Sequence, residues 1–254
     1  LLVPGAKDTL QFVRSIMPSF MVSTSYQQYI QALCNVVGFP FKNVYCTELN
    51  LDKYQIDRQE VKELKRLLEE IVAMPMIKIP ENAISINDFA ERDRQAIQRL
   101  DEIFWKKILN MKSGKILKEI NPIGGFEKAN AIKDVMKKTG CKLCNTLYVG
   151  DSITDVQSFE LVRENDGLTV SFNGNSYAIR ESEVAVLSEN TIVISILADV
   201  FSRLGKDAVL QLVKDWGPSA LEKIVDPVLY RCMNLYPTSF PRVEVITADN
   251  EERL

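Results

Sequence analysis

The segment from Leu147 to Asp155 constrains the fold of this chain more than any other part of the sequence. A short apolar run ends at Gly150, and two aspartates four residues apart, Asp151 and Asp155, follow it. In open α/β sheets, a strand that stops at a glycine and then presents carboxylates builds a metal or phosphate site at its carboxyl end. This pattern predicts a parallel sheet with a functional site at that edge.

Strand and helix signals alternate on both sides of a central helical stretch. The first visible strand runs into the polar turn Ser23-Thr24-Ser25, and an amphipathic helix and a second strand follow. Such alternation predicts a three-layer α/β fold with a mainly parallel sheet. The expected strands span residues 20–22, 43–51, 147–149, 168–172 and 184–187, and a helix at about 191–204 closes the series.

The domain boundaries should follow the same alternation. Residues 53–120 carry helical periodicity, many charges and no strand signal, which predicts a mostly helical insert. Residues 1–52 and 121–215 are expected to form the α/β core, and residues 216–254 a C-terminal extension of uncertain packing. Within that extension, residues 242–247 alternate like an edge strand.

The composition excludes several classes of function. The chain has no histidine, which removes Ser-His-Asp and Cys-His catalysis and zincin chemistry. Its net charge of −3 gives no reason to expect a nucleic acid or an anionic membrane as partner. The longest apolar stretch, Ile192 to Phe201, is far too short to span a bilayer.

The cysteines point to a reducing compartment. The five are widely scattered, so a disulfide framework is not expected and the cytoplasm is the default location. Cys141 and Cys144 form a lone Cys-x-x-Cys, which cannot complete a four-ligand zinc site. A redox role for this pair is an alternative to an incidental pair in a loop, and the loop pair is favoured.

Polar groups at three strand or helix ends suggest phosphate chemistry. Ser23 and Thr24 end the first strand, Lys128 opens a helix, and Asp151 and Asp155 follow the third strand. Mg²⁺ prefers a few carboxylates together with substrate phosphate oxygens, and lysine serves as a point charge for phosphate. Hydroxyl groups and helix N-terminal amides would complete such a site.

Each of these features also has a purely structural interpretation. Ser152 to Asp155 matches the Ser-x-x-Asp form of a capping box, worth about 1 kcal/mol of helix stability. Ser23 and its neighbours could cap the following helix, and Lys128 could be a solvated lysine. The order of the three features along the chain favours the functional interpretation.

The same features resemble the haloacid dehalogenase superfamily of phosphatases and phosphotransferases. Phe20-Met21-Val22-Ser23 resembles its second motif, Gly125-Phe126-Glu127-Lys128-Ala129 its third, and Gly150-Asp151-Ser152-Ile153-Thr154-Asp155 its fourth. Residues 171–175 and 182–186 also resemble the core that follows the fourth motif. The resemblance covers about residues 4–52 and 121–204. More narrowly, the chain is similar to an archaeal branch sometimes labelled a subunit of a methanogen energy-converting hydrogenase.

The resemblance implies roles for individual residues. Ser23 would hydrogen-bond a phosphoryl oxygen, and Lys128 would neutralise charge on the nucleophile and the transferring group. Asp151 would bind Mg²⁺, and Asp155 would support the metal site directly or through water. Thr24 and Asn173 are further phosphate-binding candidates. The implied activity is Mg²⁺-dependent hydrolysis of a small phosphorylated metabolite through an aspartyl-phosphate.

One part of the family pattern is missing from the chain. The first motif, Asp-x-Asp, supplies the nucleophile on a strand at the centre of the sheet. Asp88, Asp93 and Asp101 lie in the helical insert and do not match it. We therefore expect the nucleophile upstream of Leu1, an inactive chain on its own, and a gap in the sheet. The alternative is a non-catalytic interaction or regulatory subunit, for example of a hydrogenase complex.

The helical insert occupies the place where the family carries one class of cap. Caps cover the site, exclude water and select the substrate. Phe104 to Lys107 lie on this insert, and packing and solvent exposure are favoured for them over a position facing the site.

Overall fold

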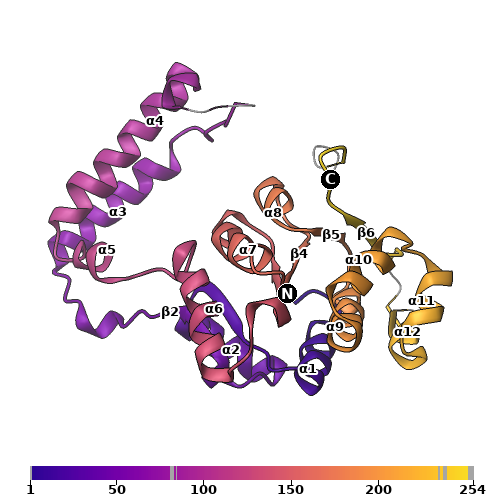
Figure 1. Cartoon of the computed structure of the whole chain (residues 1–254). Helices are drawn as coiled ribbons and strands as arrows, with labels where there is room; N and C mark the ends of the chain where they lie inside the picture. The colour runs from indigo at the N-terminus through magenta and orange to yellow at the C-terminus, as the bar shows by residue number, and fades with distance from the viewer. Residues whose placement is uncertain (1, 81–82, 84, 234, 237–238, 251–254) are drawn as a thin grey trace. The chain divides into compact units, whose positions relative to one another are not determined.

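A computed structural model describes residues 2–80, 83, 85–233, 235–236 and 239–250 of the chain. It divides into two compact units (Figure 1). Unit 1 comprises Leu1–Thr47 and Pro122–Leu254, and unit 2 comprises Glu48–Asn121. In the part of the chain that the structure describes, no helix combines the length and the apolar character needed to cross a membrane.

The described residues of unit 1 form two sheets, and their mainly parallel strands confirm the predicted α/β fold class. The first sheet pairs β1 with β2 in parallel, with Met21 opposite Val44. The second has the order β3-β4-β5-β6, in which the first three strands are parallel and β6 is antiparallel to β5. The predicted edge strand is confirmed as β6. The strands are β1 (Met21–Tyr26), β2 (Val44–Thr47), β3 (Leu147–Gly150), β4 (Leu168–Phe172), β5 (Val184–Leu187) and β6 (Arg242–Val245).

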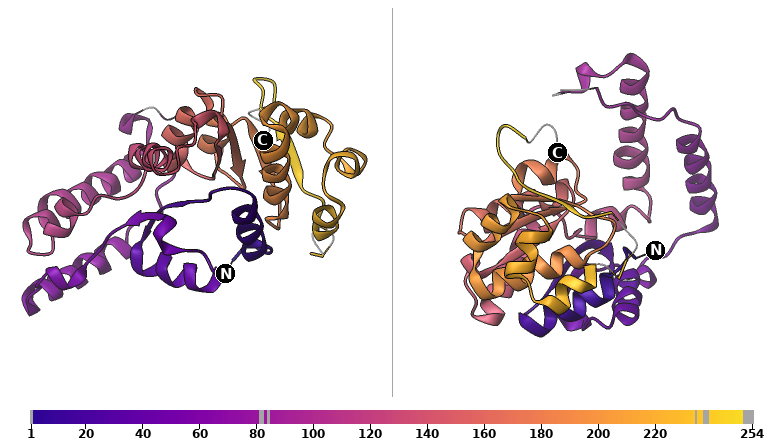
Figure 2. Two further views of the ribbon diagram at one scale, coloured as in Figure 1. Left: turned by 60° about the horizontal axis from the view of Figure 1, so that its bottom comes forward. Right: turned by 90° about the vertical axis from the view of Figure 1, so that its right-hand side faces the viewer.

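Helices cover both faces of the second sheet, which gives three layers (Figures 1 and 2). On one face, Leu168 and Val170 of β4 pack in the largest core cluster with α9 and α10. On the other face, Tyr148 of β3 packs with α6, α7 and α8. The helices of unit 1 are α1 (Ala6–Ile16), α2 (Gln27–Val37), α6 (Phe126–Thr139), α7 (Val156–Arg163), α8 (Ser176–Glu181), α9 (Ile192–Leu204), α10 (Lys206–Lys214), α11 (Pro218–Ile224) and α12 (Pro227–Met233).

A cavity of about 810 Å³ lies between the two sheets of unit 1. Val22 of β1 and Val149 of β3 line it, together with Val13 of α1, Val135 of α6 and Ala198 of α9. Among the described residues, no strand pairs with β1 or β3 on the side that faces this cavity. The gap expected from the missing first motif is therefore present in the structure.

The first strand extends further than the sequence predicted. Residues 23–26 continue β1 instead of turning into the helix, which begins only at Gln27. The hydroxyl of Thr47 donates a hydrogen bond of 2.7 Å to the carbonyl oxygen of Thr24, and Tyr26 pairs with Thr47. The predicted second strand is shorter than expected, because it ends at Thr47 and the chain leaves unit 1 there.

Unit 2 is helical, with α3 (Arg58–Val72), α4 (Glu91–Asp101) and α5 (Lys115–Glu119). Its buried apolar side chains are few, and Leu67, Ala96 and Ile103 are among them. The long helix expected to about residue 109 is interrupted, since α4 ends at Asp101 and a π-type turn spans Glu102–Lys107. A π-type turn inserts one residue per turn and so rotates the side chains that follow.

Candidate functional site

The carboxyl ends of β1 and β3 are joined by the segment 123–125. Thr24, on β1, donates its hydroxyl to the carbonyl oxygen of Ile123 at 3.0 Å. The amide of Gly125 donates to the carbonyl oxygen of Thr154, in the turn after β3, at 2.9 Å. Two predicted parts of the site, Thr24 and the turn after β3, are thus tied to one loop.

This loop opens helix α6, which carries Lys128. Gly125 has a φ of 57°, in the left-handed region that glycine adopts without strain. The helix starts at Phe126, and Lys128 lies in its first turn. The loop therefore sets where helix α6 begins, and with it the position of Lys128.

Lys128 and Asp155 form a buried ion pair. The Lys128 ammonium lies 2.7 Å from Oδ1 of Asp155, and only 6% of Lys128 and 2% of Asp155 are exposed. The same oxygen accepts a second hydrogen bond of 2.6 Å, from the hydroxyl of Tyr148. The interpretation of Lys128 as a solvated lysine is therefore wrong.

The second oxygen of Asp155 closes a capping box with Ser152. Oδ2 accepts from the amides of Asp151 and Ser152 at 3.2 and 3.1 Å and from the Ser152 hydroxyl at 3.1 Å. The box caps the short 3₁₀ turn Ile153–Asp155, which leads into α7. The capping interpretation of this segment is confirmed, and it coexists with the ion pair.

Burial and hydrogen bonding act on the titration of this cluster in opposite directions. Burial alone would raise the pKa of Asp155, but hydrogen bonds from Lys128 and Tyr148 outweigh it and hold that pKa below its usual range. Burial, followed by the charge of Asp155, raises the pKa of Tyr148. The carboxylate is therefore ionised and the phenol neutral at pH 7.

Asp151 presents a different environment from Asp155. It is exposed at the end of β3, and its carbonyl oxygen accepts from the amide of Asn175 at 2.9 Å. Among the described residues, its carboxylate has no hydrogen-bond or ion-pair partner. Backbone contacts thus hold Asp151 in place and leave its carboxylate open to a ligand.

The two aspartates consequently fit a metal ion unequally. A Mg²⁺ site uses one or two carboxylates together with water and phosphate oxygens, and the exposed Asp151 suits that chemistry. Asp155 would have to give up existing hydrogen bonds before it could bind a metal directly. In the described residues, no group of three or more His, Cys, Asp or Glu side chains could hold a metal ion. The present residues thus offer one ready ligand.

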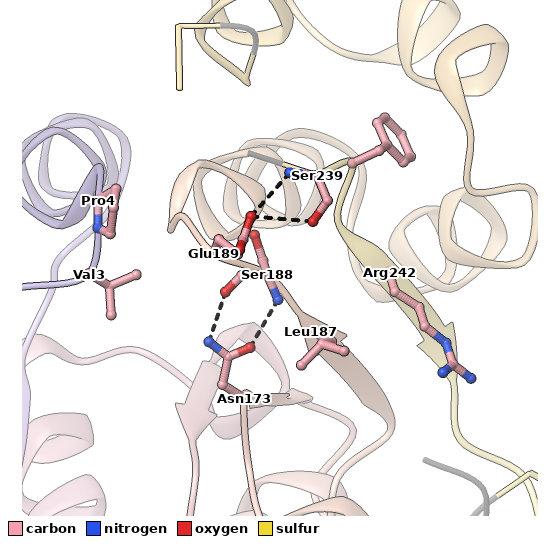
Figure 3. Close-up of a pocket in the computed structure, with 9 residues that line it drawn as sticks. Val3, Pro4, Asn173, Leu187, Ser188, Glu189, Ser239 and Arg242 are labelled. Carbon is pink, nitrogen blue, oxygen red and sulfur yellow. Dashed lines mark hydrogen bonds between the residues drawn. The ribbon is translucent and has the colours of Figure 1, made fainter. Parts of the chain in front are cut away.

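Ser23 and Asn173 are the other predicted phosphate ligands. The Ser23 hydroxyl, half-buried on β1, accepts from the amide of Ser25 at 3.2 Å. Asn173 follows β4, and its amide group exchanges two hydrogen bonds with the backbone of Ser188, of 2.8 and 2.9 Å (Figure 3). This exchange ties the end of β4 to the end of β5. The phosphate-binding role of Asn173 stays a prediction.

Asn173 also lines a surface pocket of about 580 Å³. Glu189 accepts hydrogen bonds there from the amide and hydroxyl of Ser239, and Arg242 lies on the pocket's far side from Val3 (Figure 3). No predicted site residue other than Asn173 lines this pocket.

The Cys-x-x-Cys pair lies on the surface of the protein. Cys141 and Cys144 are exposed, outside any helix or strand of at least four residues, and all five cysteines are free thiols.

Tyr148 was not among the predicted site residues. The available signal was a phenol in an otherwise aliphatic strand, seven residues before an aspartate.

Gly150 is required by close packing against Asp155. A Cβ atom at this position would lie 2.6 Å from Cγ of Asp155 and 2.9 Å from Cζ of Phe159. We therefore expect Gly150→Ala to lower the free energy of unfolding by about 2–3 kcal/mol, because the carboxylate must shift. Urea unfolding measures this. Gly217→Ala is the control, since its nearest neighbour would be at 3.8 Å; equal effects of the two changes would contradict the expectation.

Comparisons with known proteins agree with this architecture. A family model described as haloacid dehalogenase-like hydrolase matches residues 11–196. The solved structure of gene product AF1437 from Archaeoglobus fulgidus is similar to 99% of the chain, with a TM-score of 0.71 and 20% identity. The chain covers 64% of that protein's length. No curated protein sequence matches the chain.

Proposed function

The chain belongs to the haloacid dehalogenase-like hydrolases, and from that membership we propose that it is the core of a Mg²⁺-dependent phosphatase. The proposed substrate is a small phosphorylated metabolite, and the reaction is hydrolysis of its phosphoric monoester through an aspartyl-phosphate. The nucleophilic aspartate lies outside these 254 residues, so the chain by itself is inactive. Unit 2 is the proposed cap.

The observation that supports this proposal most is the meeting of two strand ends beside a buried lysine. The turn 123–125 contacts Thr24 in the carboxyl-terminal half of β1 and Thr154 just after β3. Both strands line the same cavity and both approach the loop 123–125 near their carboxyl ends, so they run in the same direction along the cavity. A strand placed in that cavity would end beside Lys128 and Asp151, where an aspartate could attack.

The cavity has the chemistry of a buried parallel strand. Its walls are largely apolar side chains of α1 and α9 on one face and of α6 on the other. A strand covered by helices on both faces is a near-continuous apolar run. The free backbone groups of β1 and β3 would hydrogen-bond to it. The missing first motif of the family is such a strand.

The site residues of this chain would each have a separate role in phosphoryl transfer. The Ser23 and Thr24 hydroxyls would bind phosphoryl oxygens, and the Lys128 ammonium would balance charge on the nucleophile and the transferring group. Asp151 would hold the metal, which when bound supplies positive charge to the phosphoryl oxygens. Asp155 would hold Lys128 in place.

The reaction would proceed in two displacements. The external aspartate would attack phosphorus, the bond from phosphorus to the alcohol oxygen would break, and that oxygen would take a proton from solvent water as the alcohol leaves. Water would then attack the aspartyl-phosphate, which releases phosphate and regenerates the carboxylate. Each step exchanges one P–O bond for another, so no oxidant or reductant is needed.

Hydrolysis of p-nitrophenyl phosphate tests the proposal. Full-length protein with Mg²⁺ is expected to release p-nitrophenol, and the 254-residue chain is expected to release none. Intact-mass spectrometry after acid quenching should show one added phosphoryl group on the full-length protein. A full-length protein no faster than its Asp151→Ala variant, over a panel of phosphorylated metabolites, would contradict the proposal.

A non-catalytic interaction subunit is the second candidate. It is favoured by one observation: Asp88, Asp93 and Asp101 all belong to helices of unit 2. None of the three therefore lies on a strand of unit 1, where the nucleophile of the first motif would be. This candidate requires that the full-length protein has no Asp-x-Asp strand for the cavity. The upstream coding sequence decides between the two.

A further inference from the structure

The surroundings of Asp155 include a buried phenol that the proposed function does not use, the hydroxyl of Tyr148. Tyr148 is 9% exposed, and its ring meets that of Phe159 edge-on, with centroids 5.3 Å apart. Burying a hydroxyl is unfavourable unless it is hydrogen-bonded, and a phenylalanine would fill the same space. The packing of β3 therefore gives no reason for a phenol at this position.

The hydrogen bonds of Asp155 provide that reason. Its Oδ1 atom accepts from the Tyr148 hydroxyl at 2.6 Å and from the Lys128 ammonium at 2.7 Å, while Oδ2 is held by backbone amides. Two donors on one oxygen fix both the rotation of the carboxylate and the direction in which it holds the ammonium. Without the phenol, Lys128 would be the only donor to that oxygen among the described residues.

We propose that Tyr148 is a positioning residue, whose hydroxyl orients Asp155 so that Asp155 holds the Lys128 ammonium at the carboxyl end of β3. This inference rests on the proposed function, because it assigns Lys128 a task in phosphoryl transfer. Tyr148 touches neither substrate nor metal in this arrangement. It acts through Asp155, from the interior of the layer formed by α6 and α7.

The chain provides a matched control for this inference. Tyr45 donates to Oδ2 of Asp134 at 2.6 Å, and Lys138 lies 2.8 Å from the same carboxylate. The three groups and the phenol-to-carboxylate distance match those of the Tyr148 cluster. Lys138 is 56% exposed and lies near the far end of α6 from Lys128, so this cluster has no part in the site.

Steady-state kinetics of full-length Tyr148→Phe and Tyr45→Phe test the inference. We expect Tyr148→Phe to lower kcat for p-nitrophenyl phosphate about tenfold and to change KM less than twofold. The reason is that the variant loses a hydrogen bond that orients a group in contact with the catalytic lysine, and no contact with the substrate. Tyr45→Phe should leave both constants within twofold. A Tyr148→Phe enzyme with the kcat of wild type overturns the inference.

Amide hydrogen exchange provides a readout that needs no activity. The amides of Asp151 and Ser152 donate to Asp155, so they should exchange about fivefold faster in Tyr148→Phe, which corresponds to roughly 1 kcal/mol. Tyr45→Phe should not change them. If the full-length protein hydrolyses no phosphate ester, the proposed function fails and exchange alone decides: faster exchange supports the positioning role, and unchanged exchange overturns it.

Discussion

Replacing Asp151 with asparagine is expected to lower kcat/KM of the full-length protein by about a thousandfold or more and to leave its thermal midpoint unchanged. The substitution removes the charge that would hold the metal and keeps the shape of the side chain. Stability should not change, because Asp151 is exposed and its structural contacts are made by its backbone. Aryl phosphate hydrolysis with Mg²⁺ and thermal unfolding measure the two quantities.

Asp166→Asn is the matched control for this experiment. Asp166 is also exposed, in the loop between α7 and β4, and its φ of 63° suits asparagine as well as aspartate. It carries the same change of charge without a place in the site. Retention of more than a third of wild-type activity by Asp151→Asn would contradict a metal-binding role for Asp151.

Replacing Lys128 with methionine is expected to lower the free energy of unfolding by about 3–5 kcal/mol at pH 7, in addition to abolishing hydrolysis. The change leaves the Asp155 carboxylate buried without its cation, and an unpaired buried charge is costly. Urea unfolding measures the loss. Lys138→Met is the control on the same helix, where an ion pair of similar length is exposed and should contribute little. Equal effects would contradict the expectation.

The destabilisation of Lys128→Met should shrink as the pH falls. In wild type the pKa of Asp155 is below its unfolded value of about 3.9, so the pair stabilises at neutral pH and the stabilisation is lost as pH falls through the folded pKa. In the variant, the loss of the Lys128 hydrogen bond and charge raises the pKa of Asp155 relative to wild type, so protonation at low pH relieves the cost. Urea unfolding should therefore show a smaller difference in stability between wild type and Lys128→Met at pH 4 than at pH 7.

The sequence predicted those parts of the fold whose signals are local. Residues 184–187 are a continuous apolar run and residues 168–172 alternate apolar and polar side chains, and the structure forms β5 and β4 over those ranges. Helices α11 and α12 were missed because each has only seven residues and no clear apolar period. The π-type turn Glu102–Lys107 was also missed, since helical periodicity continues through it.

In the candidate site, local contacts could be predicted from the sequence and tertiary contacts could not. The capping box of Ser152 and Asp155 spans four residues and could be predicted from their types. The ion pair between Lys128 and Asp155 joins residues 27 positions apart, and only the packing of α6 against α7 brings them together. The hydrogen bond from Tyr148 depends on which face of β3 the ring occupies. Chain order suggested the site, and tertiary packing set its partners.

The cavity between β1 and β3 has a consequence for how the chain behaves in solution. Each of the two strands presents a row of backbone donors and acceptors with no strand on that side in the described structure. Unpaired edges of this kind recruit strands of other molecules and so promote aggregation. These two edges should therefore limit the solubility of residues 1–254. A strand that fills the cavity should reduce aggregation, because it would pair with both edges.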